Sequence, residues 1–169
     1  IRDRFLYVFI FLFHWGFIIM KFSCSLFVLS SLCAFSSFAA TDPLVGKWKT
    51  IDDKTGYSLS DVMIEKDKNN SYKAVIVNTR EIPGAVKIEN CSKCDGVNKN
   101  QPIVGMTTLS HLQLDNAKDS TYSHGQFLDP FTGLRYDAYA RLSNNGKHLR
   151  IRGTSTENGG GRNITWVKY

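Results

Sequence analysis

The sequence predicts an all-β protein, built as one small antiparallel β-barrel of about eight strands and preceded by a signal peptide. The segment 134–142 alternates apolar and polar residues with a period of two, which is typical of a half-buried strand. Clusters of Gly, Pro, Asp and Asn separate several such segments. No ten-residue window beyond residue 40 has the spacing of an amphipathic helix. A closed barrel is favoured over a sandwich because closure removes exposed strand edges.

The limits of the predicted strands follow from the turn-forming residues between them. We expect strands over 46–50, 57–66, 72–80, 103–114, 120–128, 134–142, 148–154 and 162–169. Asn145-Gly146 predicts a hairpin, because both residue types tolerate positive φ. Asp129-Pro130-Phe131-Thr132-Gly133 predicts a second hairpin loop, in which Asp129 caps the turn and Gly133 takes the positive-φ position.

Residues 20–39 have the layout of a secretory signal peptide. Lys21 gives a basic start, an apolar centre follows, and small residues precede a cleavage site after Ala39 or Ala40. We therefore expect export to the periplasm and a single mature barrel domain over 40–169.

Residues 1–19 precede this segment and are expected to be an upstream extension that is not part of the native protein. The competing interpretation is a membrane anchor over 5–20. That run is shorter than the roughly 20 apolar residues of a spanning helix, and it contains His14 and Gly16. We expect no stable transmembrane anchor after processing.

Charge and motifs restrict the function classes. The chain has 21 Lys and Arg residues against 15 Asp and Glu residues, a net charge of +6. This excess is spread along the sequence, so no nucleic-acid partner is expected. The sequence lacks a Gly-x-Ser-x-Gly, a His-Glu-x-x-His and a phosphate loop, which argues against an enzyme. His111, His124 and His148 lack the spacing of a zinc site, so we expect no metal and no cofactor.

Cys91 and Cys94 are the two cysteines of the expected mature domain. In an oxidising compartment they predict a disulfide that closes a small loop. A redox-active pair is the alternative, although the strand-then-helix context that lowers a thiol pKa is missing. A disulfide over so short a loop contributes only about 2 kcal/mol in the chain-entropy model, so it would order a loop without holding the fold.

The opening Gly46-Lys47-Trp48 resembles the Gly-x-Trp signature of lipocalins. In that family a tryptophan seals one end of the barrel beneath an arginine from a late strand. The resemblance implies that Trp48 plugs the barrel or lines a ligand site, with Arg152 or Arg162 stacked on it.

A second resemblance covers about 44–169. Its motifs are Pro102-Ile103-Val104-Gly105, Gly125-Gln126-Phe127-Leu128-Asp129-Pro130, Gly133-Leu134-Arg135-Tyr136, Arg152-Gly153 and Gly161-Arg162-Asn163-Ile164-Thr165-Trp166. In this order they resemble domain of unknown function 2147, a family of exported bacterial proteins with a lipocalin-like barrel, one branch of which carries the cysteine pair. The usual ending is Gly-Arg-Thr-Gln-Thr-Trp, and Asn163-Ile164 depart from it. The resemblance implies a fold, but no activity.

Arg152 and Arg162 need partners if they point into the barrel, because unpaired buried charge is unfavourable. Asp129, Asp137 or tryptophan faces could supply them, and an anionic ligand is the alternative. The candidate ligand-binding residues are Trp48, Asp129, Tyr136, Arg152, Arg162 and Trp166. They predict a protein that binds a small amphiphilic or anionic ligand of the cell envelope. The alternative is an envelope structural or interaction protein that binds a protein partner through strand edges or the Cys91–Cys94 loop.

Overall fold

The computed structural model describes residues 42–84, 87–116, 118–157 and 159–169. The predicted upstream extension (1–19) and signal peptide (20–39) lie outside the described residues. The elements are β1 (Gly46–Ile51), β2 (Ser58–Lys66), β3 (Ser71–Thr79), the 3₁₀ turn η1 (Gly96–Asn98), β4 (Thr107–Leu114), β5 (Thr121–Leu128), β6 (Arg135–Leu142), β7 (His148–Ser155) and β8 (Gly161–Lys168). Within these ranges no helix has the length and apolar character needed to cross a bilayer.

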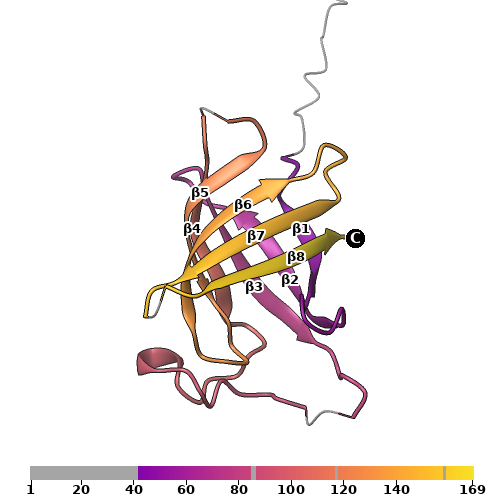
Figure 1. Cartoon of the computed structure of the whole chain (residues 1–169), viewed down its shortest axis with the longest axis vertical. Coiled ribbons are helices and arrows are strands. Elements are labelled where there is room, and N and C mark those ends of the chain that lie inside the picture. Colours follow the sequence, from indigo (N-terminus) through magenta and orange to yellow (C-terminus); the bar gives the residue numbers. More distant parts are fainter. Residues whose placement is uncertain (1–41, 85–86, 117, 158) are drawn as a thin grey trace, which may run out of the picture. The chain divides into compact units, whose positions relative to one another are not determined.

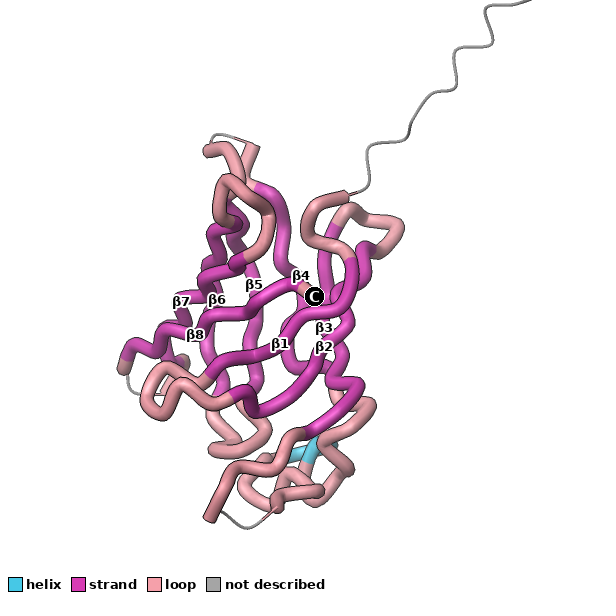
Figure 2. Tube along the Cα trace, turned by 90° about the vertical axis from the view of Figure 1, so that its right-hand side faces the viewer, coloured by secondary structure: helices cyan, strands magenta, loops and turns pink. Residues whose placement is uncertain are grey.

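The eight strands form a closed antiparallel barrel in chain order (Figure 1). Each strand pairs with its neighbours in sequence, and β1 pairs with β8 to close the barrel; Figure 2 shows the same strands from the side. The predicted all-β barrel is therefore confirmed. Each of these eight strands is hydrogen-bonded on both sides, so the barrel offers a protein partner no free edge among them.

One strand boundary differs clearly from its prediction. The segment predicted as a strand over 103–114 enters the sheet only at Thr107. Residues Ile103 to Met106 form a turn instead, in which the Met106 N–H donates to the Ile103 carbonyl at 3.1 Å and Gly105 has φ +91°. The turn ends a long connection between β3 and β4 that carries η1. The same connection contains the disulfide between Cys91 and Cys94, as predicted.

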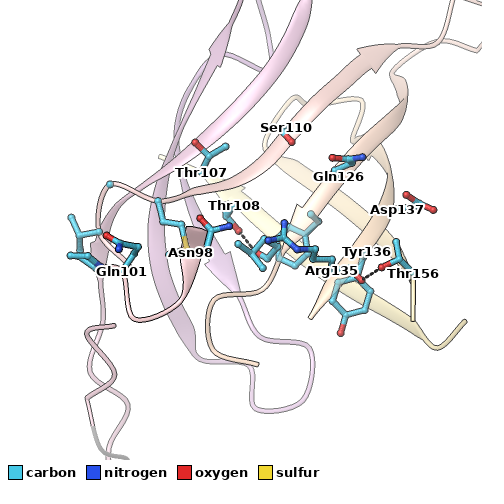
Figure 3. Close-up of a pocket in the computed structure, with 16 residues that line it drawn as sticks. Asn98, Gln101, Thr107, Thr108, Ser110, Gln126, Arg135, Tyr136, Asp137 and Thr156 are labelled. Carbon is cyan, nitrogen blue, oxygen red and sulfur yellow. Dashed lines mark hydrogen bonds between the residues drawn. The ribbon is translucent and has the colours of Figure 1, made fainter. Parts of the chain in front are cut away.

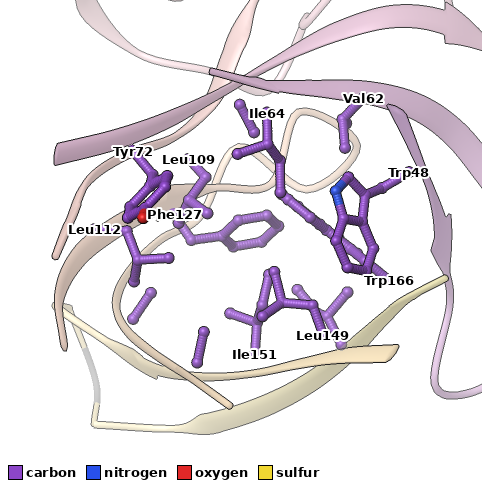
Figure 4. Packing of buried hydrophobic residues seen from close by; sticks show 14 of the residues in the cluster. Trp48, Val62, Ile64, Tyr72, Leu109, Leu112, Phe127, Leu149, Ile151 and Trp166 are labelled. Carbon is purple, nitrogen blue, oxygen red and sulfur yellow. The ribbon is translucent and has the colours of Figure 1, made fainter. Parts of the chain in front are cut away.

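Side chains from all eight strands fill the barrel interior (Figure 4). Trp48 from β1 and Trp166 from β8 are both fully buried, and Phe127 and Tyr72 reach in from β5 and β3. The Trp48 indole N–H donates to the Leu44 carbonyl at 2.9 Å, which fixes the chain just before β1 against the core. The packing agrees with Trp48 as a barrel plug, because small barrels have just enough room for their own side chains.

Candidate functional site

Arg162 points into one end of the barrel, since it shares the inward face of β8 with Ile164 and Trp166. Its guanidinium donates to the Asp129 carboxylate, and a second nitrogen lies 3.3 Å from Asp52 Oδ1. The Arg162 side chain is 17% exposed, and those of Asp52 and Asp129 are 11% and 4% exposed. Asp129 is therefore the internal partner that the sequence suggested, while Asp52 was not predicted.

Both carboxylates are held by the turns in which they stand. Asp129 accepts hydrogen bonds from the Phe131 N–H at 3.0 Å and the Thr132 hydroxyl at 2.8 Å. Asp52 accepts from the Thr55 N–H at 3.0 Å and from its hydroxyl at 2.7 Å. Asp129 thus caps its turn as predicted. The carboxylates of Asp129 and Asp52 together compensate the positive charge of Arg162, so Arg162 has no unpaired charge with which to bind an anionic ligand.

The electrostatics of this cluster follow from its burial. Burial alone acts to lower the pKa of Arg162, but the charge and hydrogen bond of Asp129 outweigh it and raise that pKa. Burial acts to raise the pKa of Asp52, but hydrogen bonds from Thr55 and the Arg162 charge bring it below its usual value. The cavity beside Trp166 has a volume of only about 30 Å³. That is space for water, and this cavity does not accommodate a larger ligand.

Trp48 and Arg152 lie away from this cluster. The cation over the Trp48 ring is Lys168, whose Nζ lies 5.3 Å from the ring centroid. The expectation that Arg152 or Arg162 stacks on Trp48 is wrong. Arg162 is bound to carboxylates in the turns at the other end of β8, and Arg152 is exposed because its neighbour Ile151 takes the inward position on β7.

A groove of about 620 Å³ lies on the outer side of the barrel wall (Figure 3). One side consists of outward positions on β4, β5 and β6, where Ser110 is opposite Gln126 and Gln126 is opposite Asp137. The other side comes from the connection that carries η1. Tyr136 is the one predicted ligand-binding residue among those that border this groove, but its position on β6 is a buried, inward one and its ring packs against Phe127, with 6.1 Å between the ring centroids.

The groove combines unpaired carboxamides with an apolar floor. The side-chain amides of Asn98, Gln101 and Gln126 make no hydrogen bond with the described part of the chain. Val104, which is 51% exposed, and Met106, which is nearly buried, contribute apolar surface from the connection. A carboxamide both donates and accepts hydrogen bonds and carries no charge, so this lining suits hydroxyl or amide groups of a ligand that also has an apolar part.

The wall of the groove is fixed by the disulfide loop. The Cys91 N–H donates to the Gln101 carbonyl at 2.9 Å, which holds the two arms of the connection together. Cys91 Sγ lies 3.0 Å from the Pro130 carbonyl oxygen. Gly133, in the same turn, packs so closely on the Lys93 carbonyl that a Cβ there would lie 2.1 Å from the oxygen. The disulfide loop therefore rests on the turn whose Asp129 binds Arg162.

Sequence reasoning missed the carboxamides of this groove. Side chains near the end of β5 alternate between the two faces of the sheet, so that Phe127 is buried and Gln126 lies on the outer face. The outward orientation of Gln126 was therefore predictable. Nothing local to the sequence places Asn98 and Gln101 beside it, because their position depends on the path of a long connection. Among the residues described, no group of three or more His, Cys, Asp or Glu side chains is arranged to hold a metal ion.

The closed barrel, the buried Gly-x-Trp tryptophan and the long β3–β4 connection with its disulfide define a small lipocalin-like barrel protein. Residues 46–168 match the model of the family described as an uncharacterized protein conserved in bacteria (DUF2147), and the chain belongs to this family. The chain is similar in structure to protein HP1028 from Helicobacter pylori, which is described as a member of the lipocalin family. That match has a TM-score of 0.59 and 20% identity, and covers 75% of this chain and 82% of HP1028, so it speaks for the fold alone. No curated protein matches the sequence.

Proposed function

We propose that the protein binds a small amphiphilic molecule in the groove outside β4, β5 and β6. The observation that carries the proposal is the set of unpaired carboxamides, Asn98, Gln101 and Gln126, around an apolar floor. A hydroxyl-bearing head group would exchange hydrogen bonds with the amides while its apolar part covers Val104 and Met106. In this proposal the ligand binds outside the barrel wall, and not in the interior or mouth of the barrel, which is where the sequence suggested a site.

The groove is a better candidate for the ligand site than the barrel interior. Its volume of about 620 Å³ lies within the usual range for small-molecule sites, whereas the cavity at Arg162 holds about 30 Å³. The connection that forms one wall is crosslinked by Cys91–Cys94. A fixed wall reduces the ordering that binding would otherwise require.

We also propose that the protein works in the periplasm after removal of residues 20–39. The basic, apolar and small-residue layout of that segment supports export, and the Cys91–Cys94 disulfide agrees with an oxidising compartment. Fractionation of cells that express the whole sequence, followed by intact mass measurement, tests this. A periplasmic species that begins at Ala40 or Thr41 supports the proposal. A cytoplasmic species that retains residues 1–39 contradicts it.

The binding proposal is tested by native mass spectrometry of the protein purified without detergent from cells that express the whole sequence. We expect a bound molecule of a few hundred daltons, and we expect Gln126→Trp to lose it because the indole fills the groove. Gln113→Trp is the matched control, since Gln113 is exposed on β4 but does not line the groove. A ligand that survives Gln126→Trp, or a protein that carries none and fails to bind added dodecyl maltoside, contradicts the proposal.

A protein partner at the Cys91–Cys94 loop is the second candidate. It is favoured by the exposure of two apolar side chains on the connection, Val97 at 87% and Val104 at 51%. A photo-crosslinking residue at position 97 tests this in the expressing cell. A discrete crosslinked protein, absent when the probe replaces Lys73 on β3, supports the partner, and unchanged monomer counts against it.

A further inference from the structure

The outer face of β6, β7 and β8 carries a second concave surface, with a volume of about 640 Å³, that shares no lining residue with the groove. Its polar side chains are Thr121, Tyr139, Arg141, Arg150, Arg152, Asn163 and Thr165. Each of them can donate a hydrogen bond, and the lining contains no carboxylate. We call Tyr139, Arg141, Arg150 and Arg152 the arginine face.

The hairpin between β6 and β7 brings three guanidinium groups together. Arg141 is paired directly with Arg150, and Tyr139 with Arg152. Paired side chains in an antiparallel sheet start about 5 Å apart, and residues two apart on one strand start about 7 Å apart. One ligand of modest size can therefore reach all three. Three positive charges are therefore close together here.

These arginines have no acidic partner within the described chain, in contrast to the other arginines there. Arg80 pairs with Asp61, Arg135 with Asp95 and Arg162 with Asp129. None of the ion pairs of the described residues involves Arg141, Arg150 or Arg152. The acidic position nearest along this face of β6 is Asp137, which belongs to the groove.

The arrangement is unfavourable for the protein alone. Like charges directly opposite each other on paired strands destabilise a sheet, and Arg141 and Arg150 hold such positions. An anion on the arginine face would remove this repulsion. The exposed Tyr139, at 56%, adds a ring and a hydroxyl beside the guanidinium groups.

We propose that the arginine face binds a ligand that carries two or more closely spaced phosphate groups. The planar guanidinium donates two parallel hydrogen bonds to a phosphate, so three of them match several phosphates better than one carboxylate. The neutral donors Asn163 and Thr165 on β8 can engage the remaining phosphate oxygens. This site is independent of the groove and of the amphiphile proposed there.

Calorimetric titration of the purified protein with inorganic tripolyphosphate tests the proposal. We expect binding that weakens as salt is raised, and about tenfold weaker binding in the double variant Arg141→Gln/Arg150→Gln, because charge-assisted hydrogen bonds are lost. Lys73→Gln, which removes an exposed charge on β3, is the control and is expected to bind as the wild type does. Equal weakening in the control, or no binding by the wild type, overturns the proposal.

Two further readouts separate a folding defect from a binding defect and identify the source of the phosphate. The double variant should melt at or above the wild-type temperature, and tripolyphosphate should raise the melting temperature of the wild type only. Flotation with phosphatidylcholine vesicles that contain phosphatidic acid tests a lipid source. Vesicle binding that tripolyphosphate reverses supports a phosphorylated lipid, whereas tripolyphosphate binding without vesicle binding supports a soluble ligand. An unchanged affinity in a folded double variant would refute the site.

Discussion

Arg162 on β8 donates a hydrogen bond to Asp129, which lies 33 residues earlier in the turn between β5 and β6. This contact links the last strand of the barrel to a turn that also supports the disulfide loop. Arg162 is thus a structural residue in the described molecule. The same turn connects the charged cluster at the barrel end to the wall of the groove.

Replacement of this arginine should be strongly destabilising. Arg162→Leu leaves the carboxylates of Asp129 and Asp52 close together without their cation, and we expect a loss of about 3 kcal/mol in the free energy of unfolding. Urea unfolding followed by circular dichroism measures it. Arg135→Leu removes an exposed ion pair with Asp95 and should change stability little. Equal effects in the two variants would contradict the account.

Asp61 should contribute to the loss of folding stability at low pH. Burial acts to raise the pKa of Asp61, but hydrogen bonds from Tyr169 and Arg80 hold it below its usual value. A lowered pKa in the folded state means that the stabilisation is present above about pH 4 and is lost as the pH falls through the folded-state value. We expect Asp61→Asn to be less stable at neutral pH and to lose less stability on acidification.

Thermal melting between about pH 6 and pH 3 measures this difference. The control is Asp119→Asn, which changes an exposed aspartate and should follow the wild-type curve. Parallel curves for the wild type and Asp61→Asn would show that Asp61 does not contribute to acid sensitivity.

Alanine substitutions at two glycines distinguish the stability lost through an unfavourable backbone conformation from the stability lost through a steric clash. Gly133 and Gly146 both have positive φ, at +78° and +68°. A Cβ on Gly133 would collide with the Lys93 carbonyl, whereas a Cβ on Gly146 meets nothing within 4 Å. Gly146→Ala should lose about 1 kcal/mol of stability, and Gly133→Ala clearly more. Similar losses measured by urea unfolding would argue against contact between the turn and the disulfide loop.

Removal of the disulfide should weaken the groove more than the barrel. Cys91→Ala/Cys94→Ala should lose about 2 kcal/mol of stability by the chain-entropy estimate. Because the loop forms one wall of the groove, affinity for dodecyl maltoside should fall in the same variant while the sheet signal in circular dichroism stays. Affinity that is unchanged would show that the loop does not shape the groove.

The strands and their faces were largely predictable, whereas the groove was not. Alternation predicted β6, whereas the direction of Arg162 was left open; the structure places it on the inward face of β8 with Ile164. The Asn145-Gly146 hairpin formed with positive φ at Gly146 alone. The same hairpin places Arg141 opposite Arg150, a relationship that the sequence contained.

The positions of Asn98 and Gln101 follow from contacts between segments far apart in the sequence. The connection between β3 and β4 takes its path from the disulfide and from packing on the turn at Gly133. Local propensity carries no information about such contacts. The partner of Arg162 at Asp52 was missed for the same reason, since 110 residues separate the two.

A nuclear magnetic resonance titration of the protein with dodecyl maltoside below its micelle concentration shows directly whether a ligand binds in the groove. The side-chain amide signals of Asn98, Gln101 and Gln126 report on the groove, and the indole N–H signals of Trp48 and Trp166 report on the interior. We predict saturable shifts of the amide signals with the two indole signals unmoved. Shifts of the indole signals with silent amides would contradict the account, because the ligand would then enter the barrel.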